Sequence, residues 1–383
     1  MKRQDVLFIV IASLFIGCQE QRKQSGIETI EVHLNKNEIR TSAIFSDVEL
    51  IQLETNDNSL LSNISKSYLG DDHLFIKSSH ELFLFNKTGE FVLKISDMGN
   101  GPNEYTRLSD FDVDETMKEI HILDKAQKKV LVYNYRGECL RSFPFDFWAI
   151  KLIMGENEKT YLYSGNEDSP SNKYKINVAT ASSFGDRLFQ IDSRKKGYLH
   201  VNSAQNFYWR NGAIYFYEAF NDTIYSLTEG VPQYYINYDQ AISSSFFDRD
   251  FQNIMSFFQE FNKEGFVNST HNAFESDNNL FFSCFHGGTK YFNVYDKNSK
   301  TCFSYNNIIE DQLFRDYEIP FVDDDFEFWI NRENEITYYI PAQRIKENLD
   351  NLQDQKLRET ISSINDDDNP VIIYCKIKSM NGV

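Results

Sequence analysis

The chain has 383 residues, of which 57 are Asp or Glu and 39 are Lys or Arg, so its formal net charge at pH 7 is -18. Nucleic-acid affinity depends on Lys and Arg side chains that displace counterions from phosphates, and the sequence contains no basic patch, which excludes nucleic acid as an expected partner. Aromatic residues make up 15% of the chain and prolines number only seven, a composition that favours stacked β-strands over disordered linkers.

The N-terminus has the pattern of a bacterial export signal. Two basic residues in MKRQD precede the apolar stretch VLFIVIASLFI, which is too short to span a bilayer as a helix. Gly17 and Cys18 follow in the sequence FIGC, which is similar to a lipobox, where the cysteine becomes the lipid-bearing first residue. An ordinary signal peptide with an incidental cysteine is the alternative. We expect a signal peptide over residues 1–17, a lipid on Cys18 that holds the protein at a membrane, and an N-terminal linker over residues 18–40.

An internal repeat predicts the fold of residues 41–383. The segments 73–91 and 120–140 align at an offset of 48 residues, and each contains an apolar strand, a polar turn, a second strand and a glycine turn. Weaker copies of this unit occupy the segments 159–178, 213–227, 280–305 and 336–345, the last being completed by 370–378. Because a blade cannot bury both faces of its sheet without neighbours, six such units predict an all-β fold, a six-bladed β-propeller.

Other segments are expected to close or interrupt this ring. Residues 48–55, VELIQLET, precede the first unit and are expected to pair with the last one, which removes exposed strand edges. Apolar residues recur at helical spacing over residues 244–265 and 342–364, which predicts two helical insertions. The first insertion carries an aromatic stripe, which we expect to pack on the outside or rim of the ring; a lid or a partner-docking helix is the alternative.

These features together resemble a known family, the six-bladed β-propeller lipoproteins of Bacteroides and its relatives, which are distantly similar to NHL-repeat propellers. The segments that carry the resemblance are FIGC, SDVELIQLET, GNGPNEY followed by DFDVDE, NDTIYSL and the C-terminal DDNPVIIYCKIK. The resemblance implies a propeller in the periplasm or on the outer membrane. It supplies no catalytic residue.

Two loops contain the candidate contact residues. GNGPNEY links the first two units, and its glycines and proline are typical of a tight turn with positive φ. We expect Glu104 to cap this turn and Tyr105 to pack between blades, with a ligand contact as the alternative. The second loop places a histidine beside Gly287 and Gly288. The candidate contacts are Gly99, Gly101, Pro102, Glu104, Tyr105 and His286.

The sequence contains no complete motif for metal binding or nucleophilic catalysis. DFDVDE resembles the start of an EF-hand loop, but Glu115 stands in place of the glycine at the sixth position and His121 in place of the glutamate at the twelfth. Strand alternation explains this segment better, with Phe111 and Val113 on one face and the aspartates on the other. The seven histidines show no HExxH spacing, and there is no G-x-S-x-G motif and no P-loop. We predict no catalytic, cofactor-binding or metal-binding residue, and only a divalent cation stays open as a cofactor.

The patterns favour a non-catalytic binding module on the cell envelope that holds an unidentified protein or glycan. The alternative is an enzyme, a divalent-metal-dependent hydrolase or lactonase in which side chains converge on an ion in the central channel. A sensor or accessory protein for nutrient import is a third hypothesis and rests on the fold alone. We expect an exported outer-membrane lipoprotein that faces the periplasm or the cell surface.

Overall fold

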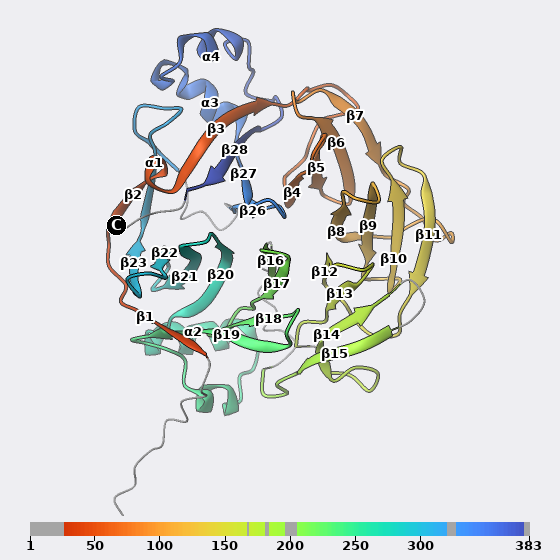
Figure 1. Cartoon of the computed structure of the whole chain (residues 1–383), viewed down its shortest axis with the longest axis vertical. Coiled ribbons are helices and arrows are strands. Elements are labelled where there is room, and N and C mark those ends of the chain that lie inside the picture. The colour runs from red at the N-terminus through yellow and green to blue at the C-terminus, as the bar shows by residue number, and fades with distance from the viewer. Residues whose placement is uncertain (1–26, 167, 181–183, 196–204, 320–326, 379–383) are drawn as a thin grey trace, which may run out of the picture.

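A computed structural model of the chain describes residues 27–166, 168–180, 184–195, 205–319 and 327–378. These residues form seven β-sheets around a central axis (Figure 1). The all-β propeller is confirmed, but the prediction of six blades is wrong. Six sheets have four or five strands and the seventh has three, so that counting each sheet as a blade gives seven.

Five consecutive sheets are meanders in which each strand pairs with the next one along the chain. Their first strands, β4, β8, β12, β16 and β20, lie nearest the centre of the ring in Figure 1. The meanders are β4 to β7 (Lys66–Leu69, His73–Ser78, Glu81–Asn86, Phe91–Ile95), β8 to β11 (Leu108–Asp114, Glu119–Asp124, Lys129–Asn134, Cys139–Pro144), β12 to β15 (Lys151–Met154, Thr160–Tyr163, Tyr174–Ala179, Phe184–Gln190), β16 to β19 (Phe207–Arg210, Ala213–Phe216, Thr223–Ser226, Val231–Tyr238) and β20 to β23 (Asn268–Glu275, Asn279–His286, Thr289–Asp296, Thr301–Tyr305).

The two ends of the chain meet in one sheet that closes the ring. β3 (Phe45–Gln52) pairs antiparallel with β28 (Val371–Ile377), and β28 continues through β27 (Glu335–Ile340) to β26 (Trp329–Ile330). The expected pairing of VELIQLET with the last unit is therefore confirmed. Near the N-terminus, β1 (Glu28–Val32) pairs parallel with β19, so part of the segment expected to be a linker forms a strand of the fourth meander.

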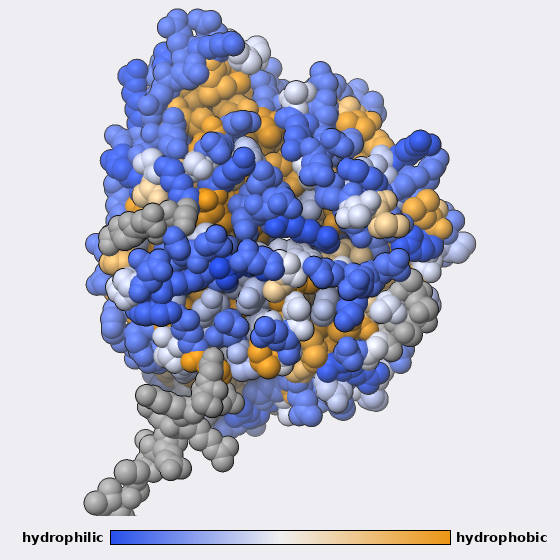
Figure 2. All heavy atoms as spheres, in the orientation of Figure 1, coloured by the Kyte–Doolittle hydropathy of each residue, from blue (hydrophilic) through white to orange (hydrophobic). Residues whose placement is uncertain are grey.

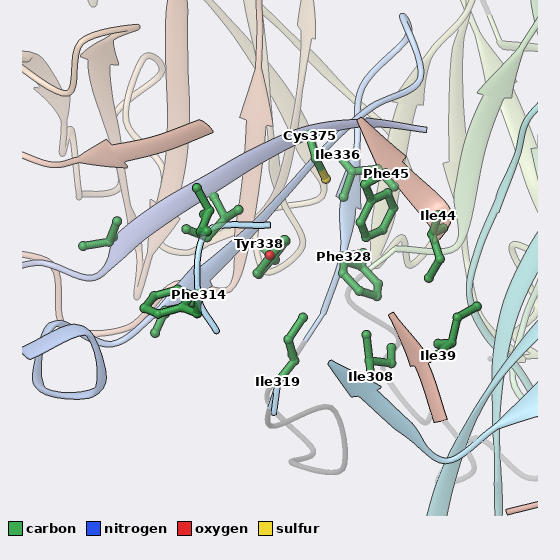
Figure 3. Packing of buried hydrophobic residues seen from close by; sticks show 14 of the residues in the cluster. Ile39, Ile44, Phe45, Ile308, Phe314, Ile319, Phe328, Ile336, Tyr338 and Cys375 are labelled. Atoms are coloured by element: carbon green, nitrogen blue, oxygen red, sulfur yellow. The ribbon is translucent and has the colours of Figure 1, made fainter. Parts of the chain in front are cut away.

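The seventh sheet consists of β2 (Glu38–Arg40), β24 (Asn307–Glu310) and β25 (Tyr317–Glu318). Its strands are only two to four residues long and come from opposite ends of the chain. They are too short to show a hydrophobic period, which is why the repeat did not reveal this sheet. Apolar side chains of this sheet, including Ile39 and Ile308, pack in one core cluster with Phe45 and Phe328 (Figure 3).

The helical insertions are shorter than predicted. The first contains a 3-10 turn, η2 (Ser244–Asp248), and a helix, α2 (Ile254–Glu264), which begins where the Asn253 side chain accepts a hydrogen bond from the backbone N–H of Ser256. The aromatic stripe packs on the rim of the ring, as expected, since its phenylalanines share a core cluster with Phe220 in the β17–β18 connection.

The second insertion is divided into three short pieces by polar residues that interrupt a helix. The run 348–351 contains Asn and Asp, which are poor helix formers, and the Asp354 side chain caps the N-terminus of the next helix, which begins at Gln355. The pieces are α3 (Ala342–Glu347), η3 (Leu349–Asn351) and α4 (Gln355–Thr360), and a four-residue helix, α1 (Thr41–Ile44), precedes β3. In the part of the chain that the structure describes, every helix is too short or too polar to cross a membrane.

Hydrophilic side chains cover most of the face shown in Figure 2, as the net charge leads one to expect. The apolar side chains are gathered into clusters that lie between neighbouring sheets. Phe75 of the first meander and Phe111 of the second share such a cluster. The first and last sheets are also joined by a hydrogen bond from Asn331 Nδ2 to the carbonyl oxygen of Leu69, at 2.7 Å.

Substitution of Phe45 tests whether the closing sheet is needed for stability. Phe45 is fully buried and its ring lies 5.6 Å from that of Phe328. We expect Phe45→Ala to lower the free energy of unfolding by about 3 to 5 kcal/mol, because it leaves a cavity in a closed core. The matched control is Leu140→Ala, at a half-exposed position on β11, which should cost about 0.5 kcal/mol or less. Urea denaturation measures both, and equal effects would contradict the role given to ring closure.

Candidate functional site

The candidate site is a cavity of about 720 Å³ at one mouth of the ring. It is walled by the segments that lead into the central strands β4, β8, β12 and β26 and by the β5–β6 and β9–β10 hairpins. Four sheets therefore contribute to it. The side chains that carry charge or aromatic surface in its lining are Lys77, His80, Arg107, Lys125, Trp148, Lys151, Glu327, Trp329 and Tyr339.

The lining carries an excess of positive charge. Among the described residues, it contains four Lys or Arg residues and one carboxylate, Glu327. Arg107 is exposed, and Lys77 and Lys151 are partly buried. This composition contrasts with the chain as a whole, whose formal charge is -18. The cavity is thus a positive region in an acidic protein, and a concave wall concentrates such a field.

Lys77 and Ser65 form a hydrogen-bonded pair in the cavity wall. Lys77 Nζ donates to Ser65 Oγ at 2.9 Å, and Ser65 Oγ donates to the carbonyl oxygen of Lys77 at 3.2 Å. A serine hydroxyl has a single proton, which here is directed to the carbonyl. Lys77 therefore acts as a donor, and the pair does not have the arrangement in which a lysine takes the proton of a nucleophilic serine.

Aromatic rings form part of the same wall. Lys125 Nζ lies 4.5 Å from the centroid of the Trp148 ring, within the range of a cation–π contact. Trp329 stacks on Tyr339 with ring centroids 5.9 Å apart and an angle of 14° between the rings. The wall therefore combines flat apolar surfaces with cationic groups, a combination that suits a ligand with both an apolar and an ionised part.

Two aspartates of β8 support the site from the axis of the ring. Asp110 accepts a hydrogen bond from the backbone N–H of Leu152 at 3.0 Å, and Asp112 accepts one from that of Met154 at 2.7 Å. Lys66 Nζ lies 3.0 Å from Asp110 Oδ1 in a buried ion pair. These contacts join the second meander to the third and to the first, which holds the cavity walls in register.

Burial and neighbouring charges shift the pKa values of these groups. Burial lowers the pKa of Lys77 to about 8; Asp110 opposes this shift, and the cationic neighbours Lys151, Lys66 and Arg107 add to it. Burial also lowers the pKa of Lys151, again against the attraction of Asp110. Lys77 therefore loses its charge more readily near neutral pH than an ordinary lysine does.

The two carboxyl groups respond to burial in different ways. Burial alone would raise the pKa of Asp110, but Lys66 and Lys151 together with the Leu152 N–H hold it below its usual range. Burial raises the pKa of Glu327, and the attraction of Lys290 and Lys151 offsets only part of that rise. Asp110 is thus firmly ionised, whereas the negative charge of Glu327 is disfavoured.

The predicted contact loop GNGPNEY lies outside the lining of this cavity and makes internal contacts. Glu104 Oε2 accepts the backbone N–H of Gly101 at 2.8 Å, and the buried Tyr105 donates to the carbonyl oxygen of Ile95 at 3.0 Å. Neither Gly99 nor Gly101 has a positive φ, contrary to the expectation for this turn. A Cβ atom at Gly99 would lie 1.9 Å from Glu104 Oε2, so a larger residue there would displace the Glu104 side chain from its present position.

The remaining sequence predictions fall at other places. His286 ends β21, at the hairpin whose Gly287 and Gly288 have φ values of 58° and 78°, and it does not line the cavity. Pro102 belongs to the contact loop, and its carbonyl oxygen accepts a hydrogen bond from Lys129 Nζ at 3.4 Å. Cys18 lies outside the described residues. The alternation of DFDVDE is confirmed, since Phe111 and Val113 are buried in the core on the opposite side of β8 from Asp110 and Asp112.

The cationic side chains of the cavity were missed by the sequence analysis. One signal was available, because the repeat offset of 48 places Lys77 on Lys125 and both side chains line the same cavity. Arg107 and Lys151 have no such signal, since they belong to segments that lead into two different strands. Within the described ranges, no group of three or more His, Cys, Asp or Glu residues is placed to hold a metal ion.

Comparison with known proteins identifies relatives of the fold. Residues 27–376 match a family described as a domain of unknown function, DUF4934. A Bacteroides fragilis protein described as exported has a similar structure, with a TM-score of 0.71 and 22% sequence identity over 92% of this chain and 100% of that chain. A member of the DUF4221 family from Bacteroides vulgatus has a TM-score of 0.50 and 11% identity over 87% of this chain and 97% of that chain. No curated protein matches the sequence.

Substitution of Asp110 tests the charge arrangement beneath the cavity. Asp110→Asn keeps an acceptor for the Leu152 N–H but leaves the buried Lys66 without its ion-pair partner. We expect a loss of about 3 to 5 kcal/mol in the free energy of unfolding at pH 7. Because the pKa of Asp110 is lowered in the fold, the advantage of the wild type should be complete above about pH 4 and disappear as the pH falls through the lowered value.

The matched control is Asp114→Asn at the end of the same strand. Asp114 accepts backbone N–H groups at an exposed turn, and an asparagine oxygen can replace it, so the change should cost about 0.5 kcal/mol or less. Urea denaturation at a series of pH values compares the two variants. A pH-independent loss for Asp110→Asn would show that the charge of Asp110 does not contribute to the stability of the fold.

Proposed function

The chain belongs to the DUF4934 family, and on this premise we propose that it is an exported propeller that binds a ligand in the mouth cavity without changing it chemically. The observation that carries this proposal is the cavity itself, which four sheets build from polar, cationic and aromatic side chains. Its size of about 720 Å³ lies within the range of small-molecule sites, roughly 300 to 1,000 Å³. A small ligand, such as a glycan unit, suits it better than the flat surface of a folded protein.

The arrangement of the wall supports binding in preference to nucleophilic catalysis. The proton of Ser65 is directed to a carbonyl oxygen, and Lys77 donates to Ser65. The lysine, arginine and tryptophan side chains of the wall lie on strands or close to their ends, and they are suited to hold and orient a ligand, since the rigid sheets fix their positions. The candidate loop GNGPNEY uses its polar groups internally, so we place the ligand in the cavity and not on that loop.

Export and membrane attachment form the second part of the proposal. The charged and apolar N-terminus has the pattern of an export signal, and the similar Bacteroides fragilis protein is described as exported. We propose that Cys18 carries the lipid and that the propeller is an outer-membrane lipoprotein facing the periplasm or the cell surface. In this arrangement, the cavity is available to ligands outside the cytoplasm.

A cavity-blocking variant tests the binding site. Ala126 is exposed at the cavity rim in the β9–β10 hairpin, so Ala126→Trp should fill the mouth and leave the fold intact. The wild type is screened by thermal shift against mono- and disaccharides, sugar acids, nucleotides, amino acids and short peptides. A ligand present at 100 times its Kd stabilises by about 2.7 kcal/mol, which raises the Tm by several degrees, and Ala126→Trp should abolish that rise.

The matched control is Thr116→Trp, an exposed position in the hairpin at the other end of the same sheet. It introduces the same side chain away from the cavity and should leave the ligand-induced shift unchanged. A ligand that stabilises Ala126→Trp as much as the wild type would show that its site lies elsewhere on the molecule. Chemical conversion of a ligand by the wild type and not by Ala126→Trp would contradict the non-catalytic part of the proposal.

The Cys18→Ala variant tests membrane attachment. In cells labelled with an alkyne-bearing fatty acid, the wild type should incorporate the label and sediment with membranes, because one or more acyl chains hold it there. Cys18→Ala should lose the label and be released into the soluble fraction. The control is Cys139→Ala, at a free cysteine within the second meander, which should keep both properties. A labelled, sedimenting Cys18→Ala protein would contradict lipidation at this residue.

A further inference from the structure

We infer that the ligand of the mouth cavity is an anion, a small molecule whose carboxylate, phosphate or sulfate group is bound by Lys77 and Arg107. This inference rests on the proposed function and adds the chemical class of the ligand. The shared chemistry is an oxyanion next to a ring or other flat apolar part, and it follows from the charges, hydrogen bonds and aromatic surfaces of the cavity wall.

Arg107 and Lys77 have hydrogen-bond donors to spare. Lys77 uses one of the three ammonium donors for Ser65. Arg107 is exposed at the cavity wall, and among the described residues its guanidinium group has no ion pair or hydrogen-bond partner. A guanidinium group offers two parallel N–H donors to a carboxylate, phosphate or sulfate group, which is the strongest form of such a contact.

Among the described residues, the carboxylates near the cavity neutralise these two cations only in part, since the attraction of Asp110 does not cancel the lowering of the Lys77 pKa by burial. Asp110 is the ion-pair partner of Lys66 and accepts the Leu152 N–H. In the part of the lining that the structure describes, Glu327 is the one carboxylate, and its buried position disfavours the negative charge. Lys77 and Arg107 repel each other, since each cationic neighbour of Lys77 lowers its pKa. A bound anion would relieve this repulsion.

The aromatic wall favours an anion that also has a flat or ring-shaped part. Trp148 lies next to Lys125, whose ammonium group is 4.5 Å from the ring centroid, and both line the cavity with Arg107. An indole ring presents an apolar face of the kind on which sugar rings pack. Sugar acids and charged sugar esters therefore combine the features that this wall can recognise, and they supply the probes.

The test compares four sugars that share one ring: galacturonate, galactose 6-phosphate, galactose 6-sulfate and uncharged galactose. Isothermal titration at low ionic strength gives the Kd of each for the wild type, for Arg107→Gln and for Arg136→Gln. Arg136 is an exposed arginine in the β10–β11 turn, outside the cavity, so it provides the same change of charge at another place. We expect at least one anionic sugar to bind and galactose to bind much more weakly.

Loss of the guanidinium group should weaken binding of the anion about tenfold to hundredfold in Arg107→Gln, since charge-assisted hydrogen bonds have that magnitude. Arg136→Gln should leave the Kd within about twofold. The sugar that loses most affinity in Arg107→Gln identifies which of the three anionic groups the cavity prefers. Equal weakening in both variants would overturn the inference, because it would mean that only the net charge of the chain matters.

The pH dependence gives a second readout. The charged groups that act on Lys77 are Asp110, Lys151, Lys66 and Arg107, and burial lowers the pKa of Lys77 to about 8. Its charge is present below that pH and is lost above it, so the affinity for the anion should fall between pH 7 and pH 9. Lys77→Met should remove this decline. An affinity that does not change over this interval in the wild type would contradict a contact with Lys77.

The outcomes separate this inference from the proposed function. One outcome is that galactose or another neutral ligand binds to the wild type but not to Ala126→Trp, while none of the anions binds. In that case the cavity is a binding site, and the anionic class of the ligand is wrong. If an anion binds equally well to Ala126→Trp, it occupies another place and the inference is overturned. Binding of an anion that requires both an open cavity and Arg107 supports the two proposals together.

Discussion

The structure depends on closure of the ring, since each sheet can bury both faces only between two neighbours. The apolar clusters lie between sheets, as the shared cluster of Phe75 and Phe111 shows. The last interface is made by both ends of the chain: β3 completes the sheet of β28, and the seventh sheet fills the space beside it around Phe45 and Phe328. The cavity follows from the same constraint, because its walls come from sheets that only the closed ring brings together.

The charges at the axis have a related origin. The innermost strand of each meander has one edge that faces the channel, where backbone N–H groups need acceptors. Asp110 and Asp112 meet this need for Leu152 and Met154. A buried carboxylate requires a compensating cation, and Lys66 supplies it. Lys77 and Arg107 line the cavity itself, and among the described residues neither of them forms an ion pair with a carboxylate of its own.

The fold could be predicted from the sequence to the extent that its strands are long and regular. The sequence alone predicts the apolar strand β10 and the alternation in β8 that places Phe111 and Val113 on one face. The seventh sheet is not, because Glu38–Arg40 and Tyr317–Glu318 are too short for any period and come from opposite ends of the chain. The cavity was missed for a similar reason. Arg107 and Lys151 lead into the central strands of two different sheets, and no spacing along the chain relates them.

The pairing of β3 with β28 also has a consequence for the order of events during synthesis. Ile51 of β3 pairs with Ile372 of β28. β3 is therefore synthesised early but can pair with β28 only after nearly all the other strands have been made. The five meanders are each built from adjacent segments and can form as they emerge. Until β28 arrives, β3 has no partner and the first and last sheets keep an uncovered face. A half-made chain is therefore an open arc of sheets, and it gains its final stability only when β28 has been made and pairs with β3.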